Sequence, residues 1–170
     1  MKGTRQANSV TIDSNTHAIR NLHINVGKTE NITYVASNAR TKKGMGSLID
    51  RGANGGVAGD DVRIILRTNR NVNVTGIADH QLPDLNGCTV GGVVRTQRGE
   101  VIVVMNQYAY TGNGKTIHSS SQLESYKQKV DDRSMKVGGE QRITTPDGYA
   151  IPLNIVDSLC YMRMRPYTDT

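Results

Sequence analysis

The sequence predicts a single, mainly β domain with one short helix, and three observations lead to this class. The chain has 170 residues, which is a usual length for one domain and enough to bury a core. Hydrophobic residues make up 36% of the chain and charged residues 21%, a balance typical of folded globular proteins. Because Phe and Trp are absent, the core must consist of Val, Ile, Leu, Met and Tyr, a mixture that favours sheet.

The N-terminal part is expected to contain a polar arm and three strands. Residues 1–22 are polar and aperiodic, so we expect a flexible arm that precedes a β domain over residues 23–170. Apolar and polar residues alternate in LHINV (22–26) and ITYVAS (32–37), which predicts two strands. GSLID (46–50) predicts a third, short strand that runs into a cluster of glycines.

The middle of the chain contains the clearest hairpin. DDVRIIL (60–66) fits either a strand or a helical turn, whereas NVNVTGI (71–77) has period two and predicts a strand. VGGVVRT (90–96) is expected to pair with EVIVVMNQYAY (100–110) across QRG (97–99). Apolar runs of this length predict buried strands.

The C-terminal part is expected to contain the helix, a second hairpin and a last strand. SSSQLESYKQKVDD (119–132) is the one good helix candidate, and its serines can supply the N-cap. QRITTPDGYAIPLNI (141–155) predicts a hairpin that turns at PDG (146–148). SLCYMRMRP (158–166) predicts a strand that closes the domain.

Charge and cysteine content argue against several classes of function. The net charge is +6, but the basic residues are spread out and are not interleaved with aromatic residues, so we expect no nucleic-acid partner. Cys88 and Cys160 are far apart in the sequence, and neither these cysteines nor the four histidines have a spacing typical of metal ligands. We therefore expect no bound metal. A disulfide between the two cysteines is possible but not required. No run approaches the roughly 18 apolar residues of a membrane helix, so we expect no membrane partner. No signal peptide is visible, which predicts a cytoplasmic protein.

One segment fits a relaxed phosphate-binding loop. In AYTGNGKT (109–116), Ala109 stands where the first glycine belongs, Lys115 would reach the outer phosphates and Thr116 would meet Mg²⁺, with Asp157 as a second metal-side group. The surrounding pattern of hairpins is not the alternation of strands and helices that a parallel nucleotide-binding sheet requires. Nucleotide binding through Lys115 is therefore the weakest of the functions that the sequence suggests.

A single aspartate stands in an unusual setting. GSLIDRGANGGVAG (46–59) places Asp50 directly after a short apolar run and before a cluster of small residues. Two interpretations fit these residues. Asp50 is either a reactive carboxylate held at the end of a strand or part of an ordinary turn, since Asp and Gly both favour turns.

Several long segments of the sequence resemble one protein family. The segments are ITYVASNARTKKGMGSLIDRGANGGVAGDDVRII, VTGIADHQ, GGVVRTQRGEVIVVMNQYAYTGNGKTIHSSSQLE, VGGEQRITTPDGYAIPLNI and YMRMRPYTD. In order and content they resemble the protease domain of copia-type retrotransposon polyproteins, particularly those abundant in diatoms, over roughly residues 31–170. The resemblance implies a retropepsin-like closed β-barrel, a homodimer, a peptide or polyprotein substrate, and no cofactor.

The resemblance also implies that Asp50 is the catalytic residue, one from each subunit. Two carboxylates a few ångström apart cannot both ionise, so the pair shares one proton. The ionised carboxylate takes a proton from the attacking water while the protonated one polarises the peptide carbonyl. Arg51, Gly52 and Ala53 would support the catalytic loop, and the small size of Gly52 and Ala53 would let the two loops approach closely.

Two further expectations concern a flap and a departure from the family pattern. The polar stretch 75–84, with Gly76, Ile77, Asp79 and His80, is the candidate flap over the substrate; an ordinary hairpin loop fits the same residues. The family motif has Thr or Ser after the aspartate, where this chain has Arg51. A guanidinium beside Asp50 would lower the pKa of that carboxylate and oppose proton sharing. Arg51 can instead point outward or form a different contact between the subunits.

The leading hypothesis is therefore a homodimeric aspartic endopeptidase of retroelement type. The alternative is a catalytically inactive domain of the same fold that serves as a self-assembling structural subunit. Unpaired edge strands on a β-rich chain favour such association.

Overall fold

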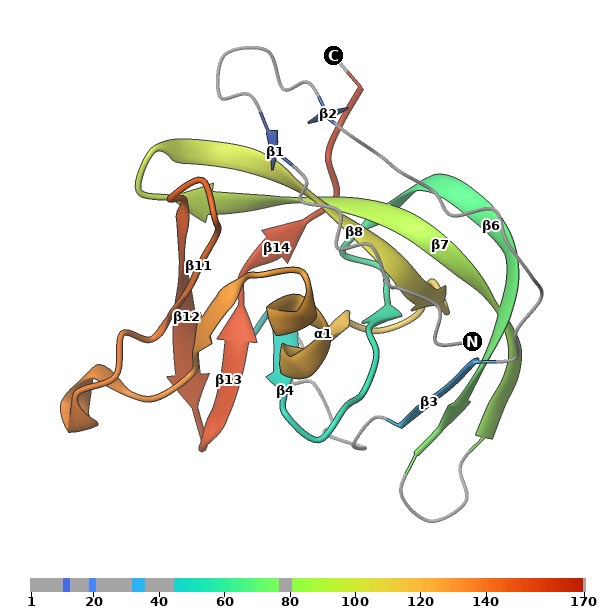
Figure 1. Cartoon of the computed structure of the whole chain (residues 1–170), viewed down its shortest axis with the longest axis horizontal. Helices are drawn as coiled ribbons and strands as arrows, with labels where there is room; N and C mark the ends of the chain where they lie inside the picture. Colours follow the sequence, from blue (N-terminus) through green and yellow to red (C-terminus); the bar gives the residue numbers. More distant parts are fainter. Residues whose placement is uncertain (1–10, 13–18, 21–31, 36–44, 77–80, 170) are drawn as a thin grey trace, which may run out of the picture.

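The chain folds into one large, strongly curled β-sheet that forms a half-barrel (Figure 1). This computed structural model describes residues 11–12, 19–20, 32–35, 45–76 and 81–169. The one α-helix in these ranges, α1 (Ser120–Ser125), lies in front of the sheet in the view of Figure 1. The prediction of a mainly β chain with one short helix is confirmed.

The sheet follows a single path of hydrogen-bonded strands. Its members are β3 (Ile32–Val35), β4 (Ser47–Asp50), β5 (Val57–Ala58), β6 (Arg63–Thr75), β7 (Gln81–Thr96), β8 (Gly99–Tyr110), β9 (Ile117–Ser119), β10 (Lys129–Asp131), β11 (Arg142–Thr144), β12 (Ala150–Val156), β13 (Leu159–Met162) and β14 (Met164–Arg165). The spatial order is β10-β11-β12-β13-β4-β9-β5-β8-β7-β6-β3, and β14 pairs with β7. Within the described ranges the end strands β10 and β3 do not pair with each other, so the sheet is described as a half-barrel, and the closed barrel that the resemblance implies stays a prediction.

The two predicted hairpins are confirmed. In the first, β7 and β8 are antiparallel, with Val94 opposite Val101 across the turn. In the second, β11 and β12 are antiparallel, with Ile143 opposite Ile151. The segment 60–66, which fits either a strand or a helical turn by sequence, contributes to β6, and this strand also contains most of the strand predicted at 71–77.

The predicted helix over 119–132 is wrong in its second half. Ser119 is the N-cap as expected, because its side chain accepts a hydrogen bond from the Gln122 N–H. The helix ends at Ser125, and Lys129–Asp131 forms β10. Tertiary contacts explain the difference, because Val130 is buried in the core and pairs with β11.

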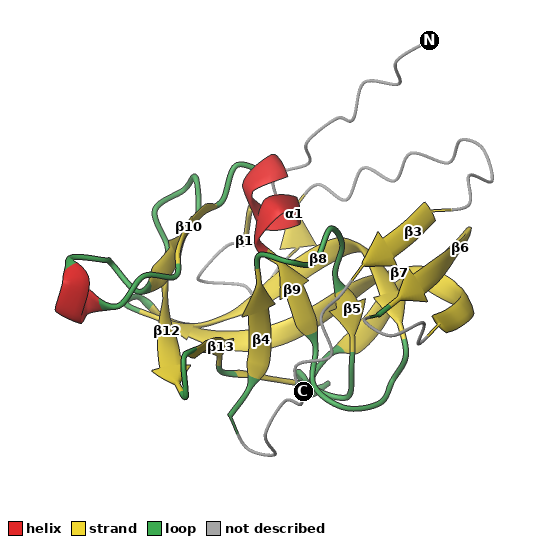
Figure 2. Cartoon of the chain, turned by 90° about the horizontal axis from the view of Figure 1, so that it is seen from below, coloured by secondary structure: helices red, strands yellow, loops and turns green. Residues whose placement is uncertain are grey.

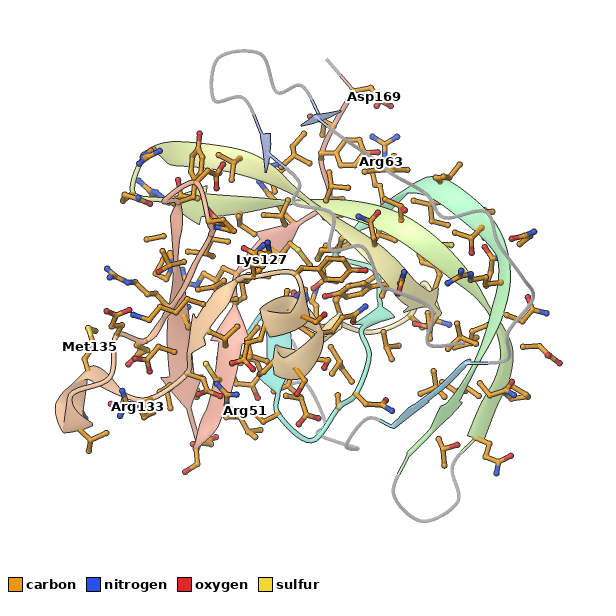
Figure 3. All side chains as sticks on the ribbon, viewed as in Figure 1. Arg51, Arg63, Lys127, Arg133, Met135 and Asp169 are labelled. Atoms are coloured by element: carbon orange, nitrogen blue, oxygen red, sulfur yellow. The ribbon has the colours of Figure 1, made fainter. Side chains whose placement is uncertain are left out.

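The last strand predicted at 158–166 is divided in two. β13 pairs with β4 and β14 pairs with β7, with Arg163 between them, so the C-terminal segment joins two parts of the curl. Arg63 on β6 holds the end of the chain, because its guanidinium lies 4.5 Å from the centroid of the Tyr167 ring and bonds to both carboxylate oxygens of Asp169 (Figure 3).

The N-terminal predictions are covered only in part. β1 (Thr11–Ile12) and β2 (Ile19–Arg20) form a separate antiparallel pair within the expected arm. β3 confirms a strand in the segment 32–37 and runs parallel to β6. The strand expected at 22–26 and the boundary between arm and domain lie outside the described residues.

The core has the composition that the sequence predicts. Its largest cluster contains Ile49, Val94, Val101, Val130, Ile143, Tyr149, Ile151, Leu153, Cys160 and Met162. Cys88 and Cys160 are buried and both thiols are free, so the disulfide that the sequence allows is not formed. Burial raises the pKa of the Cys160 thiol to about 11. No helix in the described part of the chain has both the length and the apolar character needed to cross a membrane.

The crossing of two loops requires a glycine at position 59. A Cβ there would collide with the carbonyl oxygen of Gly114 and lie 2.7 Å from the carbonyl carbon of Lys115. Since both contacts are with backbone, the Gly59→Ala variant is expected to lower the free energy of unfolding by roughly 2 kcal/mol. Urea denaturation measures this loss, and an unchanged midpoint and slope would contradict the close approach.

Candidate functional site

Asp50 is the last residue of β4, which lies in the middle of the sheet between β13 and β9 (Figure 2). β4 is short because it enters directly from Gly46 and ends in a turn, and its residues Leu48 and Ile49 are buried. β4 and β9 are parallel, with Asp50 in register with Ser119. Asp50 as a whole is half-buried.

The loop after Asp50 is fixed by short contacts. The Gly52 N–H donates a hydrogen bond of 2.7 Å to Asp50 Oδ1, so Asp50 forms the turn that one of its two interpretations predicts. A Cβ on Gly52 would lie only 3.1 Å from the same oxygen. Ala53 is buried, and its carbonyl accepts a bond of 2.7 Å from the Ser119 hydroxyl. These contacts hold Asp50, Gly52 and Ala53 in one turn, and a side chain at position 52 would crowd the Asp50 carboxylate.

Gln122 supports the same loop, and no pattern in the sequence signals this role. Its Oε1 accepts from the Gly56 N–H at 2.6 Å, while its Nε2 donates to the carbonyls of Asn106 at 3.3 Å and Gln107 at 3.2 Å. Gln107 has φ of 60° at an irregularity in the pairing of β7 with β8, which directs these carbonyls towards α1. One side chain on α1 therefore ties the loop after Asp50 to β8.

Arg51, labelled in Figure 3, is bonded to α1 and to the segment around β10, which corresponds to the outward orientation. Its Nη1 lies 3.1 Å from Glu124 on α1 and its Nε 2.9 Å from Asp132 after β10. Its Nη2 donates to the carbonyl of Val130 at 3.1 Å. The guanidinium thus bonds to α1 and to the segment around β10. Through these bonds, Arg51 connects the loop after β4 to both elements.

The ion pairs of Arg51 are exposed, so their expected effect on stability is small. Both pairs involve a guanidinium side chain that is 50% exposed. We expect the Arg51→Met variant to lose less than about 1 kcal/mol of unfolding free energy, and to lose less still at high salt because salt screens exposed charges. Thermal unfolding at low and high salt measures this difference, and a large loss that does not depend on salt would contradict the assignment.

The candidate flap lies at the tip of the long β6–β7 hairpin. Thr75 pairs with Gln81 at its base, so residues 76–80 form the connection between these strands. Gly76 directly follows β6, whereas Ile77, Asp79 and His80 lie outside the described residues. The hairpin fits a flap and an ordinary loop equally, and both interpretations stay open.

The segment that resembles a phosphate-binding loop is occupied by internal contacts. Lys115 Nζ lies 3.2 Å from Asp60 Oδ1, and the fully buried Thr116 donates both its hydroxyl and its N–H to Asp61. The Gly114 carbonyl accepts from the Asp60 N–H, and β9 rather than a helix follows. The groups that would bind phosphate and Mg²⁺ fasten this loop to residues 60–61, which argues against the nucleotide hypothesis.

A buried histidine lies one residue from the register partner of Asp50. His118 is fully buried on β9, and Tyr108 Oη lies 2.8 Å from its Nδ1. Burial lowers the pKa of His118 to about 4, against the opposing effect of the Asp61 charge. The imidazole is therefore neutral at neutral pH.

The chemical group that the site offers is a carboxylate. In the described ranges no group of three or more His, Cys, Asp or Glu side chains is placed to hold a metal ion. Asp50 offers a half-buried carboxylate in a tight turn with Gly52, and a carboxylate is a group that can serve as a general acid or base. Comparison of this chain with protein-family models, with curated proteins and with solved structures finds no match.

Proposed function

We propose that this chain is an aspartic endopeptidase of retroelement type, with a retropepsin-like fold that acts as a homodimer. The observation that carries the proposal is the placement of Asp50. Its carboxylate stands at the end of a central strand, is held by the Gly52 N–H at 2.7 Å, and is followed by Gly52 and the buried Ala53. In the proposed dimer, the same turn of a second subunit brings its own Asp50 to this carboxylate.

The proposed mechanism uses the two copies of Asp50 as one acid–base pair. With one proton between them, the ionised carboxylate removes a proton from water as the water oxygen attacks the peptide carbonyl. The protonated carboxyl donates its hydrogen to the carbonyl oxygen, which gives a neutral tetrahedral diol. Proton transfer to the amide nitrogen then releases the amine and the new carboxyl terminus. Because Arg51 is engaged by Glu124 and Asp132, its charge is partly neutralised by those acids.

The proposed substrate is an extended peptide segment of a polyprotein. Such a segment can add to a sheet by main-chain hydrogen bonds, with side-chain pockets providing selectivity. The tip of the β6–β7 hairpin would close over it. The identity of the cleaved bonds would depend on those pockets.

The experiment is a cleavage assay on the full chain with a mixture of peptides. Mass spectrometry identifies new peptide termini, and pepstatin tests for an aspartic mechanism. The assay is run at roughly pH 6, because protonation of His118 in the unfolded state favours unfolding at lower pH. Pepstatin-sensitive cleavage supports the proposal; a folded, dimeric protein that cleaves no peptide would contradict it.

The second candidate is a self-assembling structural subunit of the same fold. It is favoured by one observation: the end strands β10 and β3 each have a sheet neighbour on only one side among the described residues. Such edges promote association between chains. Sedimentation distinguishes the two candidates, because large assemblies without cleavage, and unaffected by Asp50→Asn, favour the structural role.

A further inference from the structure

The chain contains three Asn-Gly pairs, and the structure places them in different surroundings. Asn113 and Gly114 are both exposed, in the loop that joins β8 to β9. Gly55 and Gly87, the glycines of the other two pairs, are buried. In an Asn-Gly pair the backbone nitrogen of the glycine attacks the asparagine amide readily, because glycine has no side chain to hinder the approach. The exposed pair is therefore a candidate site of chemical modification, whether or not the chain cleaves peptides.

The reacting groups of the exposed pair are not held by hydrogen bonds. Within the described part of the chain the Asn113 side-chain amide has no hydrogen-bond partner, and neither has the Gly114 N–H. Gly114 has φ of 66°, and the space where a Cβ would stand is open. By contrast, Asn86 Nδ2 donates to the Thr68 carbonyl at 2.8 Å, and Asn86 Oδ1 accepts from the Cys88 thiol at 3.1 Å. The Asn86 side chain is thus fixed as long as β7 stays in the sheet.

We propose that Asn113 deamidates spontaneously, before the other two Asn-Gly pairs of the folded chain, and that its isoaspartate product weakens the loop between β8 and β9. The Gly114 nitrogen loses its proton to solvent base and bonds to Asn113 Cγ, and ammonia leaves. Water then opens the resulting five-membered imide. Cleavage of the bond from the nitrogen to Cγ gives aspartate. Cleavage of the bond from the nitrogen to the main-chain carbonyl carbon gives isoaspartate, in which the main chain runs through Cβ and Cγ and is one atom longer.

The longer main chain of isoaspartate matters because the loop crosses another segment directly after Asn113. The Gly114 carbonyl accepts a hydrogen bond of 2.7 Å from the Asp60 N–H, and a Cβ on Gly59 would collide with the same oxygen. An additional main-chain atom before Gly114 displaces this carbonyl from the crossing. The loop leads into β9, which pairs with β4, so isoaspartate at position 113 is expected to destabilise the centre of the sheet.

Incubation of the full chain at mildly alkaline pH, followed by tryptic digestion and mass spectrometry, tests the site. The three pairs fall in separate tryptic peptides, residues 52–63, 71–95 and 99–115, and fragmentation identifies the converted asparagine. In the folded chain Asn113 is expected to convert at least about tenfold faster than Asn86, which reacts only when β7 opens. In guanidinium chloride the three rates are expected to be similar, because the local sequence alone then sets them. A folded chain in which Asn113 converts no faster than the other two asparagines would overturn the proposal.

The Asn113→Gln variant tests the structural consequence. Glutamine keeps an amide, but its attack by the next nitrogen forms a six-membered ring, which closes far more slowly, so position 113 is expected to stay unconverted. Incubated wild type is expected to unfold at a lower urea concentration as its isoaspartate content rises, whereas incubated Asn113→Gln keeps its midpoint. An isoaspartate-specific methyltransferase measures that content. An equal loss in the two proteins, or no loss in wild type that contains isoaspartate at position 113, would overturn the proposal.

Discussion

The Asp50→Asn variant is expected to lose peptide cleavage by about 10²- to 10⁴-fold while it keeps its fold. An amide at this position can neither take the proton from the attacking water nor share a proton with its partner. The amide oxygen can still accept the Gly52 N–H that Asp50 Oδ1 now accepts at 2.7 Å, so the turn is expected to persist. Initial cleavage rates together with circular dichroism separate lost chemistry from lost structure.

Asp157→Asn is the matched control for this substitution. Asp157 and Ser158 form the two-residue turn between β12 and β13, with φ of 49° and 64°. Asn is favoured in such turns, so the control makes the same chemical change without strain. Full activity in Asp50→Asn, or an equal loss in Asp157→Asn, would remove Asp50 from the catalytic role.

Unfolding at mildly acidic pH is the second large expected effect, and His118 is its cause. Burial lowers the pKa of His118 to about 4 in the folded chain, against an ordinary value of 6.5. Between these values the unfolded chain binds a proton that the folded chain does not bind. The free energy of unfolding is therefore expected to fall as the pH is lowered from 6.5 to 4, by roughly 3 kcal/mol in total.

The His118→Gln variant tests this origin of acid sensitivity. Gln has no titrating group but can still bond to the Tyr108 hydroxyl, and the other three histidines stay in place. Urea denaturation at several pH values should show a flatter dependence for the variant between pH 6.5 and 4. Parallel curves for the two proteins would assign the acid sensitivity to other groups.

The strands of the sheet are predictable where the sequence signals for them come from neighbouring residues. The turn at 97–99 lies between long apolar runs, and the turn at 146–148 contains Pro, Asp and Gly, so both hairpins follow from neighbouring residues. The predicted helix over 119–132 is too long because Val130 pairs with β11, a contact that helical propensity does not contain. The curl of the sheet depends on the pairing of β4 with β9 and β13, which are distant in sequence.

The candidate site is predictable for the residues that are contiguous in the chain. Asp50, Gly52 and Ala53 form one turn, and their small size signals close packing. The role of Gln122 is not predictable, because it contacts Gly56 across 66 residues of sequence and has no distinctive neighbours. The orientation of Arg51 is not predictable from the sequence either, because its partner Asp132 is 81 residues away.

The central claim is that two copies of Asp50 form one catalytic site, and subunit mixing tests it most directly. Wild-type and Asp50→Asn chains are combined in varying ratios and allowed to exchange subunits, and cleavage of one peptide is measured. A site built from two carboxylates predicts that activity falls with the square of the wild-type fraction, because a mixed dimer carries a single aspartate. A fall in direct proportion to that fraction would show that each chain acts alone and would contradict the shared site.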